Sequence, residues 1–256
     1  MTSNFKLNSN YSLFYRYDGA APARFREARV FDTTVWTAEG AAMTWGEERR
    51  TKHASAGEAQ AAYAAFCAAA PSEGYTLERA SLIDPAMFDA PLLKTLLVAA
   101  TRQAVCALRA AHPGQHFNAY ALLSDDSAMT ISLLANSREA LASAEDEDEM
   151  LWNPGEWQFD EGGAYFDSAY RLLLQAHREL PFEVEFEVFR AAAFEVGIAA
   201  LELLDREGLF GTGAEREETV LLFEVSDSDA IDGAVERLNT PAMVARLNAW
   251  MASWAD

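Results

Sequence analysis

Short aromatic segments separated by turn residues fill the first fifty residues of the chain and restrict what it can fold into. Residues 4–52 hold four segments rich in aromatic and β-branched residues, and Asn, Asp and Gly residues separate them. Short runs of this kind, joined by turn residues, are typical of antiparallel strands. The pattern therefore predicts an antiparallel meander.

A single helix is predicted to follow this sheet. Ser55 and Glu58 have the spacing of a capping box, apolar residues then recur at helical intervals, and Pro71 and Gly74 mark the end. One helix on a small sheet is the expected arrangement of a first domain, residues 1–80.

Residues 81–256 predict a larger domain of helices around a second small antiparallel sheet, so the fold class is α+β. A helix from about Pro85 to Ala111 is followed by two strand-like runs that predict a hairpin turning at Asp125 and Asp126. A strand at residues 218–227 and two closing helices complete the domain.

The segment that starts at Phe182 allows two interpretations. It alternates as a strand does, yet Phe182, Phe186 and Phe189 also recur at helical spacing. Pro181 suits a first helical position and Gly208 suits a stop, so one long helix is preferred.

The acidic excess of the chain is confined to its second part. The sequence carries 20 basic and 40 acidic side chains, and residues 1–80 hold nine of each. An acidic domain is repelled by nucleic acid and anionic lipid and attracted to basic proteins. Solubility alone would produce the same excess.

The acids are densest in residues 143–157, "SAEDEDEMLWNPGEW", and no Lys or Arg occurs between Arg138 and Arg171. A turn at residues 153–155 could present two tryptophans beside these acids, and aromatic anchors beside complementary charge are typical of tight interfaces. The alternative is that the tryptophan rings belong to the core while the acids face water.

The first domain resembles the WGR domain, a small β-sheet module associated with DNA-end sensing and ADP-ribosylating enzymes. The resemblance covers about residues 4–79 and rests on the opening hairpin, the Trp45-Gly46 pair and the following helix. Glu47 stands where that family has Arg, which weakens the implied phosphate contact. Arg49, Arg50 and Lys52 are the candidate nucleic-acid contacts, although alternation along a strand would divide them between two faces.

Residues 85–250 resemble a bacterial family known only as a domain of unknown function. The resemblance rests on "FNAYALLSDD", "LWNPGEWQFD", "ALELLDREGLFG" and "VLLFEVSD". It implies no catalytic residues, and it points toward immunity proteins, which neutralise a cognate secreted toxin by binding it.

Catalytic, metal and cofactor motifs are weak in this sequence. His112 and His116 are four residues apart, but Pro113 and Gly114 interrupt the helix that would align them, so a turn is favoured over a metal site. "SDSDAIDG" lacks the ligands of a calcium loop, and three alternating Glu residues at 183–187 favour a solvated face over a glycosidase pair. We therefore expect no cofactor and no enzymatic activity; a hydrolase with an unrecognised site is the weaker alternative.

Location is expected to be cytoplasmic, without membrane contact. The start of the chain lacks the features of a secretory signal, and Lys94, Arg102 and Arg109 interrupt the longest apolar run. Cys67 and Cys106 are expected to be buried free thiols.

The expected function is that of an immunity protein whose acidic domain binds a basic toxin domain, a nuclease in the preferred version. The expected partner-binding residues are Glu145, Asp146, Glu147, Asp148, Glu149, Trp152, Glu156, Trp157, Asp160 and Glu161. The alternative is a nucleic-acid or ADP-ribose sensing adaptor that acts through Arg49, Arg50 and Lys52. The oligomeric state is left open.

Overall fold

The computed structural model describes residues 9–82, 88–160, 162–179, 183–226 and 233–253. The chain divides into two compact units, residues 1–87 and 88–256, and each is described by itself. The predicted boundary after residue 80 falls one residue before the end of a strand, Thr76–Ser81.

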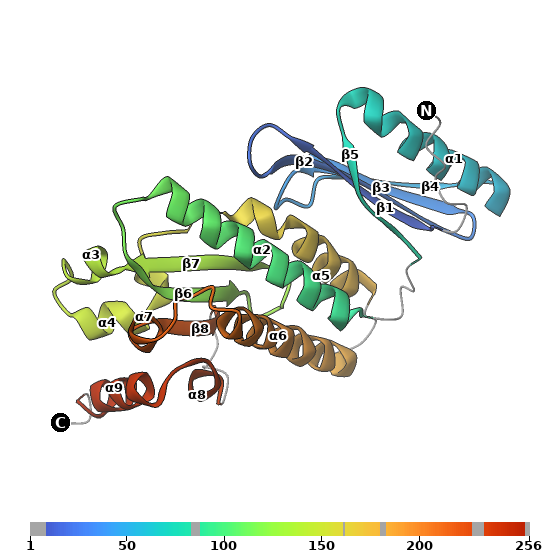
Figure 1. The fold of residues 1–256 in the computed structure, drawn as a ribbon. Helices are drawn as coiled ribbons and strands as arrows, with labels where there is room; N and C mark the ends of the chain where they lie inside the picture. Colours follow the sequence, from blue (N-terminus) through green and yellow to red (C-terminus); the bar gives the residue numbers. More distant parts are fainter. Residues whose placement is uncertain (1–8, 83–87, 161, 180–182, 227–232, 254–256) are drawn as a thin grey trace. The chain divides into compact units, whose positions relative to one another are not determined.

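The first unit is built on a five-stranded antiparallel sheet with the order β4-β3-β2-β1-β5 (Figure 1). Its strands are β1 (Tyr11–Tyr17), β2 (Pro22–Phe31), β3 (Thr34–Ala41), β4 (Glu47–Lys52) and β5 (Thr76–Ser81). The predicted meander forms β1 to β4. Strand β5 was not predicted, because this edge strand is polar and mostly exposed and so lacks an apolar pattern.

One helix, α1 (Ala56–Ala69), packs on this sheet and continues into the short helix η1 (Ala70–Glu73). Ser55 begins it as predicted, because its side chain accepts a hydrogen bond from the Glu58 backbone N–H at 3.2 Å. Tyr63 and Cys67 of α1 lie in a core cluster with Phe14 of the sheet. A second buried cluster, which includes Phe25 and Trp36, occupies the opposite face of the sheet.

The second unit contains a three-stranded sheet with the order β7-β6-β8. Its strands are β6 (Phe117–Ser124), β7 (Ile131–Ser137) and β8 (Val220–Val225). The hairpin of β6 and β7 is antiparallel, as predicted, but β8 runs parallel to β6. The prediction of a purely antiparallel sheet was therefore wrong, because the chain returns to β6 through a long helical crossover and not through a hairpin.

Helices cover both faces of this sheet. The longer helices are α2 (Ala90–Ala111), α5 (Asp167–Glu179), α6 (Glu183–Arg206) and α9 (Pro241–Ala252). The short ones are α3 (Arg138–Leu141), α4 (Glu147–Trp152), η2 (Pro154–Glu156), η3 (Gly163–Phe166), α7 (Ala214–Glu217) and α8 (Ala234–Leu238). The predicted long helix from residue 182 corresponds to α6, while Pro181 and Phe182 lie outside the described residues.

One face of the sheet is covered by α2 and α6, and α5 packs beside α2 (Figure 1). Phe194 of α6 lies 5.6 Å from the ring of Phe223 on β8. A Cβ atom at Gly197 would lie 2.1 Å from the same ring, so only glycine allows α6 to approach β8 this closely.

The helix α2 is long and apolar enough to cross a membrane by composition, but its buried stripe, which includes Leu93, Leu97 and Leu108, is that of a core helix.

The other face of the sheet packs against α4 and α9. Leu151 of α4 and Met243 of α9 join one core cluster with Leu222 of β8. This cluster brings the acidic segment, which carries α4, onto the sheet.

Of the two cysteines, Cys67 is buried as expected, but Cys106 is exposed, because it lies on the outer side of α2.

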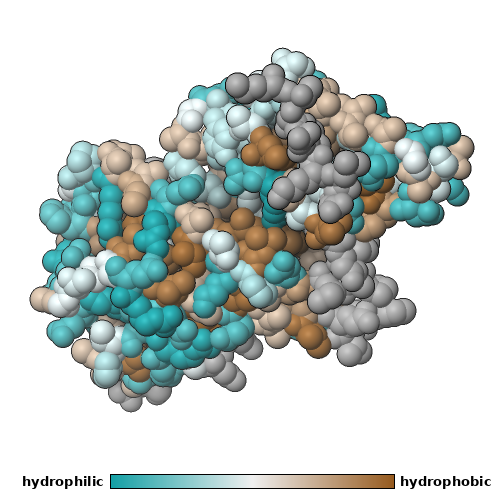
Figure 2. Space-filling model, turned by 45° about the vertical axis from the view of Figure 1, so that its right-hand side comes forward, coloured by the Kyte–Doolittle hydropathy of each residue, from teal (hydrophilic) through white to brown (hydrophobic). Residues whose placement is uncertain are grey.

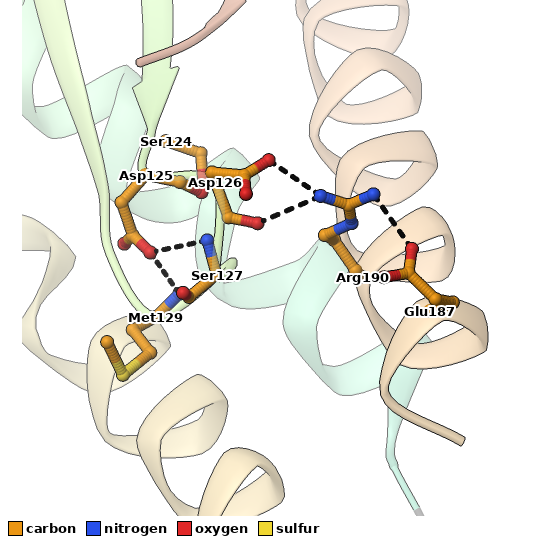
Figure 3. A network of polar contacts seen from close by, with 7 residues as sticks. All are labelled: Ser124, Asp125, Asp126, Ser127, Met129, Glu187 and Arg190. Atoms are coloured by element: carbon orange, nitrogen blue, oxygen red, sulfur yellow. Dashed lines mark hydrogen bonds and ion pairs between the residues drawn. The ribbon is translucent and has the colours of Figure 1, made fainter. Parts of the chain in front are cut away.

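The turn of the β6–β7 hairpin is held by its two aspartates (Figure 3). Asp125 accepts hydrogen bonds from the backbone N–H groups of Ser127 and Met129 at 2.9 and 3.3 Å. Arg190 of α6 donates to Asp126 at 2.6 Å and to Glu187 at 2.7 Å. Asp125 and Asp126, from which the turn was predicted, therefore stabilise the turn itself and its contact with α6.

Candidate functional site

The first part of the acidic segment is organised by α4. Asp146 is the N-cap residue, and its side chain accepts a hydrogen bond from the Glu149 backbone N–H at 3.0 Å. Glu147, Asp148 and Glu149 occupy the first turn, where a negative charge is favoured by the helix dipole. These acids cap and stabilise the start of α4, which accounts for part of the acidic run.

Arg246 of α9 neutralises two of these acids. It donates to Asp148 at 2.6 Å and to Glu147 at 3.0 Å, and it links the C-terminal helix to α4. Partial burial acts to lower the pKa of Arg246, but its hydrogen bonds to Glu147 and Asp148 outweigh this, and the pKa is raised.

Trp157 lies in the core. Its side chain is 7% exposed, and its Nε1 donates a hydrogen bond to the Met150 carbonyl oxygen at 2.8 Å. Trp152 is half-buried and packs against the same cluster. Of the two interpretations of the tryptophans, the core role describes Trp157, and its ring is not accessible as an interface anchor.

Five acids of the predicted site remain at the surface without an ion-pair partner among the described residues. They form what we call the acidic rim: Glu145, Asp146, Glu149, Glu156 and Asp160. Glu161, the remaining predicted residue, lies outside the described residues. Figure 2 shows one face of the molecule, on which hydrophilic side chains cover much of the second unit at the lower left.

Two other acids between Arg138 and Arg171 have internal partners. Glu139 accepts hydrogen bonds from the His116 backbone N–H at 2.9 Å and pairs with the His116 ring at 2.6 Å. These two contacts lower the pKa of Glu139 to about 2. Asp167 is fully buried and pairs with buried Arg171 at 3.3 Å.

The candidate nucleic-acid contacts of the first unit lie on two faces of β4. Arg49 pairs in register with Thr37, whereas Arg50 and Lys52 pair with residues of the alternate set. Arg49 lines a hollow of about 510 Å³ together with Arg24 and Arg26. The three predicted cations therefore do not form one patch.

The local backbone requires the glycine of the Trp-Gly pair that carries the WGR resemblance. Gly46 has a φ of +72°, and a Cβ atom there would lie 2.8 Å from the Glu39 carbonyl oxygen and 2.4 Å from the Phe25 ring. No other residue fits this turn without displacing its neighbours.

A second hollow lies in the second unit and was not predicted from the sequence. It has a volume of about 650 Å³, and its lining includes Arg109, His112, His116 and Arg138. The available signal was the pair of histidines four residues apart, for which a turn was predicted. Within the described ranges, no group of three or more His, Cys, Asp or Glu side chains is placed to hold a metal ion.

The second unit is a mixed sheet between helical layers and carries the acidic rim. Its sequence matches a known protein family. Residues 97–240 match the family described as Domain of unknown function (DUF4303). The match covers more than half of the 256 residues, and the chain belongs to this family. The match leaves residues 1–96 outside it, and the WGR resemblance stays a prediction.

No curated protein matches the chain. Among solved structures, the crystal structure of a Bacteroides fragilis protein from a structural genomics consortium is 26% identical, with a TM-score of 0.25. The alignment covers 27% of this chain and 19% of that protein, which is less than a fifth of its length.

Proposed function

We propose that this protein is a cytoplasmic immunity protein that neutralises a cognate secreted bacterial toxin by binding it through the acidic rim. The observation that carries the proposal is the exposure of five rim carboxylates without a described ion-pair partner. Neighbouring Glu147 and Asp148, in contrast, are already paired with Arg246.

Electrostatics supports a basic partner. Like charges on one short segment repel one another, and a cationic surface would offset that repulsion. Charge complementarity also speeds diffusional encounter and rejects partners of the wrong sign. A nuclease is the preferred toxin class, because a cleft that binds nucleic-acid phosphates is basic by necessity.

The packing of the segment also suits a docking surface. Leu151 is buried in the core, Trp157 holds the Met150 carbonyl oxygen, and Arg246 ties α4 to α9. A surface that is already ordered loses less conformational entropy when it binds.

Capture of the tagged protein from its native cells at low salt tests the proposal. We expect one stoichiometric protein partner with a basic domain, identified by mass spectrometry and released as salt rises. The variant for this test is Glu145→Lys with Glu156→Lys. It reverses two charges of the rim and leaves intact the N-cap Asp146 and the two acids bound by Arg246.

Glu217→Lys with Glu236→Lys is the matched control, because it makes the same net charge change at two exposed positions outside the rim. With the purified partner, we expect the rim variant to associate roughly tenfold more slowly at low salt, because charge steering changes on-rates by that order or more. Equal slowing in both variants would mean that net charge alone matters and would contradict a role for the rim.

Capture of nucleic acid in place of a protein would also contradict the proposal. Retention of that nucleic acid by residues 1–82 alone would then favour the adaptor function expected from the WGR resemblance.

A further inference from the structure

The hollow in the second unit has the size of a small-molecule site and shares no lining residue with the acidic rim. Its volume is about 650 Å³, within the usual range of ligand pockets. We call it the Arg109 pocket. It is formed where the C-terminal end of α2, the loop after it, the start of α3 and the region of α7 meet.

The lining combines donors and acceptors. Arg109, His112, His116 and Arg138 come from α2, its following loop and α3. The carboxylates come from Glu215 in α7 and Glu218 just after it, and Arg138 pairs with Glu218 at 2.6 Å. A concentration of guanidinium and imidazole groups is notable in a unit dominated by acids.

Arg109 differs from most described arginines of this unit, which pair with carboxylates. Its Nε and Nη2 donate to the hydroxyl oxygen of buried Tyr120 at 3.2 and 2.8 Å. Among the described residues, no carboxylate lies within ion-pair distance of Arg109. The exposed guanidinium is therefore positioned by a neutral group, and no described carboxylate neutralises its charge.

The Tyr120 hydroxyl holds Arg109 from the core side, because Tyr120 is buried and is not among the residues that line the pocket. Burial raises the pKa of Tyr120, although Arg109 opposes this effect, and the phenol is neutral at physiological pH. Its oxygen accepts hydrogen bonds from Nε and Nη2 of Arg109, so this neutral buried group fixes the direction of the guanidinium.

The wall of the pocket that carries the histidines is held in place before any ligand arrives. Ser137 donates to the Gln115 side chain at 2.5 Å, and the Arg138 backbone N–H donates to the His116 carbonyl oxygen at 3.0 Å. The His112 ring lies 4.9 Å from the Phe159 ring in an edge-on contact. Preorganised walls of this kind reduce the entropy lost on binding.

We propose that the Arg109 pocket binds a small ligand that carries both an oxyanion, phosphate or carboxylate, and an amino group. Arg109 holds the oxyanion, because guanidinium groups match the geometry of phosphate and carboxylate oxygens. Glu215 faces the amino group. A ligand with an anion alone would meet the carboxylate of Glu215 without compensation, whereas Glu218 is already paired with Arg138.

Nuclear magnetic resonance of the four histidine Cε1–H signals in the full-length protein tests this proposal. The probes are phosphoethanolamine, glycine and inorganic phosphate, and single His→Gln variants assign the signals. We expect saturable shifts of the His112 and His116 signals with at least one amino-bearing probe, at lower concentration than with inorganic phosphate, and no saturable shift at His53 or His177.

Arg109→Gln is expected to weaken the response about tenfold or more, because a charge-assisted hydrogen bond is lost. Arg206→Gln is the control, since Arg206 is an exposed arginine of α6 that does not line the pocket. Tyr120→Phe is a second variant for the case that Arg109→Gln fails to fold. It keeps Arg109 but removes the hydroxyl that positions it, so the response should also weaken.

Glu215→Gln separates the two halves of the proposal. It should weaken the amino-bearing probe and leave or strengthen the response to inorganic phosphate. A response to phosphoethanolamine alone would identify phosphate as the oxyanion, and a response to glycine alone would identify carboxylate. Absence of a saturable shift with all three probes, or equal shifts in Arg109→Gln and native protein, would overturn the proposal.

Discussion

Arg246 of α9 donates to Asp148 of α4 at 2.6 Å, across 98 residues of sequence. The contact shows that the acidic segment is partly neutralised from the C-terminal helix. It also separates two classes of acid in one run: Glu147 and Asp148, which pair with Arg246, and the acids of the rim, which have no ion-pair partner among the described residues.

Replacing Arg246 with Met is expected to destabilise the protein by about 0.5–1 kcal/mol, the range of partly exposed ion pairs. Urea unfolding of the native protein and this variant measures the loss. High salt should reduce the difference, because mobile ions screen exposed charges. A double-mutant cycle with Asp148→Asn should give a coupling energy that differs from zero; additive losses would contradict the ion pair.

The contact of Glu139 with His116 predicts a dependence of stability on pH. The pKa of Glu139 is lowered to about 2 by hydrogen bonds from the His116 backbone and ring, so folding favours its ionised form. This contribution is complete above the ordinary pKa of 4.5 and is lost as the pH falls from there through about 2.

Glu139→Gln should therefore lower the unfolding temperature at pH 6, and the difference from native protein should shrink between pH 4.5 and pH 2.5. Thermal unfolding at low protein concentration measures it, because the sequence isoelectric point is near 4.5. A difference that is constant across this range would assign the effect to a cause other than ionisation.

Trp157 is predicted to matter for folding more than for binding. Trp157→Ala should cost about 3–5 kcal/mol of unfolding free energy, the usual range for loss of a buried aromatic ring. Trp157→Phe should cost less, and the loss of the hydrogen bond to Met150 contributes about 1 kcal/mol. Urea unfolding checks both. A stable Trp157→Ala variant with impaired partner binding would instead restore the surface interpretation.

The buried pair of Asp167 and Arg171 is predicted to tolerate joint replacement better than the loss of one partner. Both side chains are 0% exposed, so Asp167→Ala leaves a buried guanidinium without its paired carboxylate and should cost about 3–5 kcal/mol. Asp167→Leu with Arg171→Met should recover much of that loss in urea unfolding. If the double variant is as unstable as the single one, other contacts of these side chains dominate.

Much of the fold could be predicted from local patterns. The meander, the capped helix after Ser55, the β6–β7 hairpin and the long helix α6 each depend on periodicity and turn residues within a few positions. The edge strand β5 and the parallel pairing of β8 could not be predicted in this way, because both depend on partners far away in sequence.

The candidate site, like the fold, could be predicted from the sequence only in part. The sequence by itself determined where negative charge is concentrated, because a charge count needs no coordinates. Only the tertiary structure decided which of the described acids have an ion-pair partner: Arg246 of α9 pairs with Glu147 and Asp148, and Trp157 packs in the core. The physical reason is that charge belongs to each residue, whereas burial and pairing depend on which distant segments the packed sheet brings together.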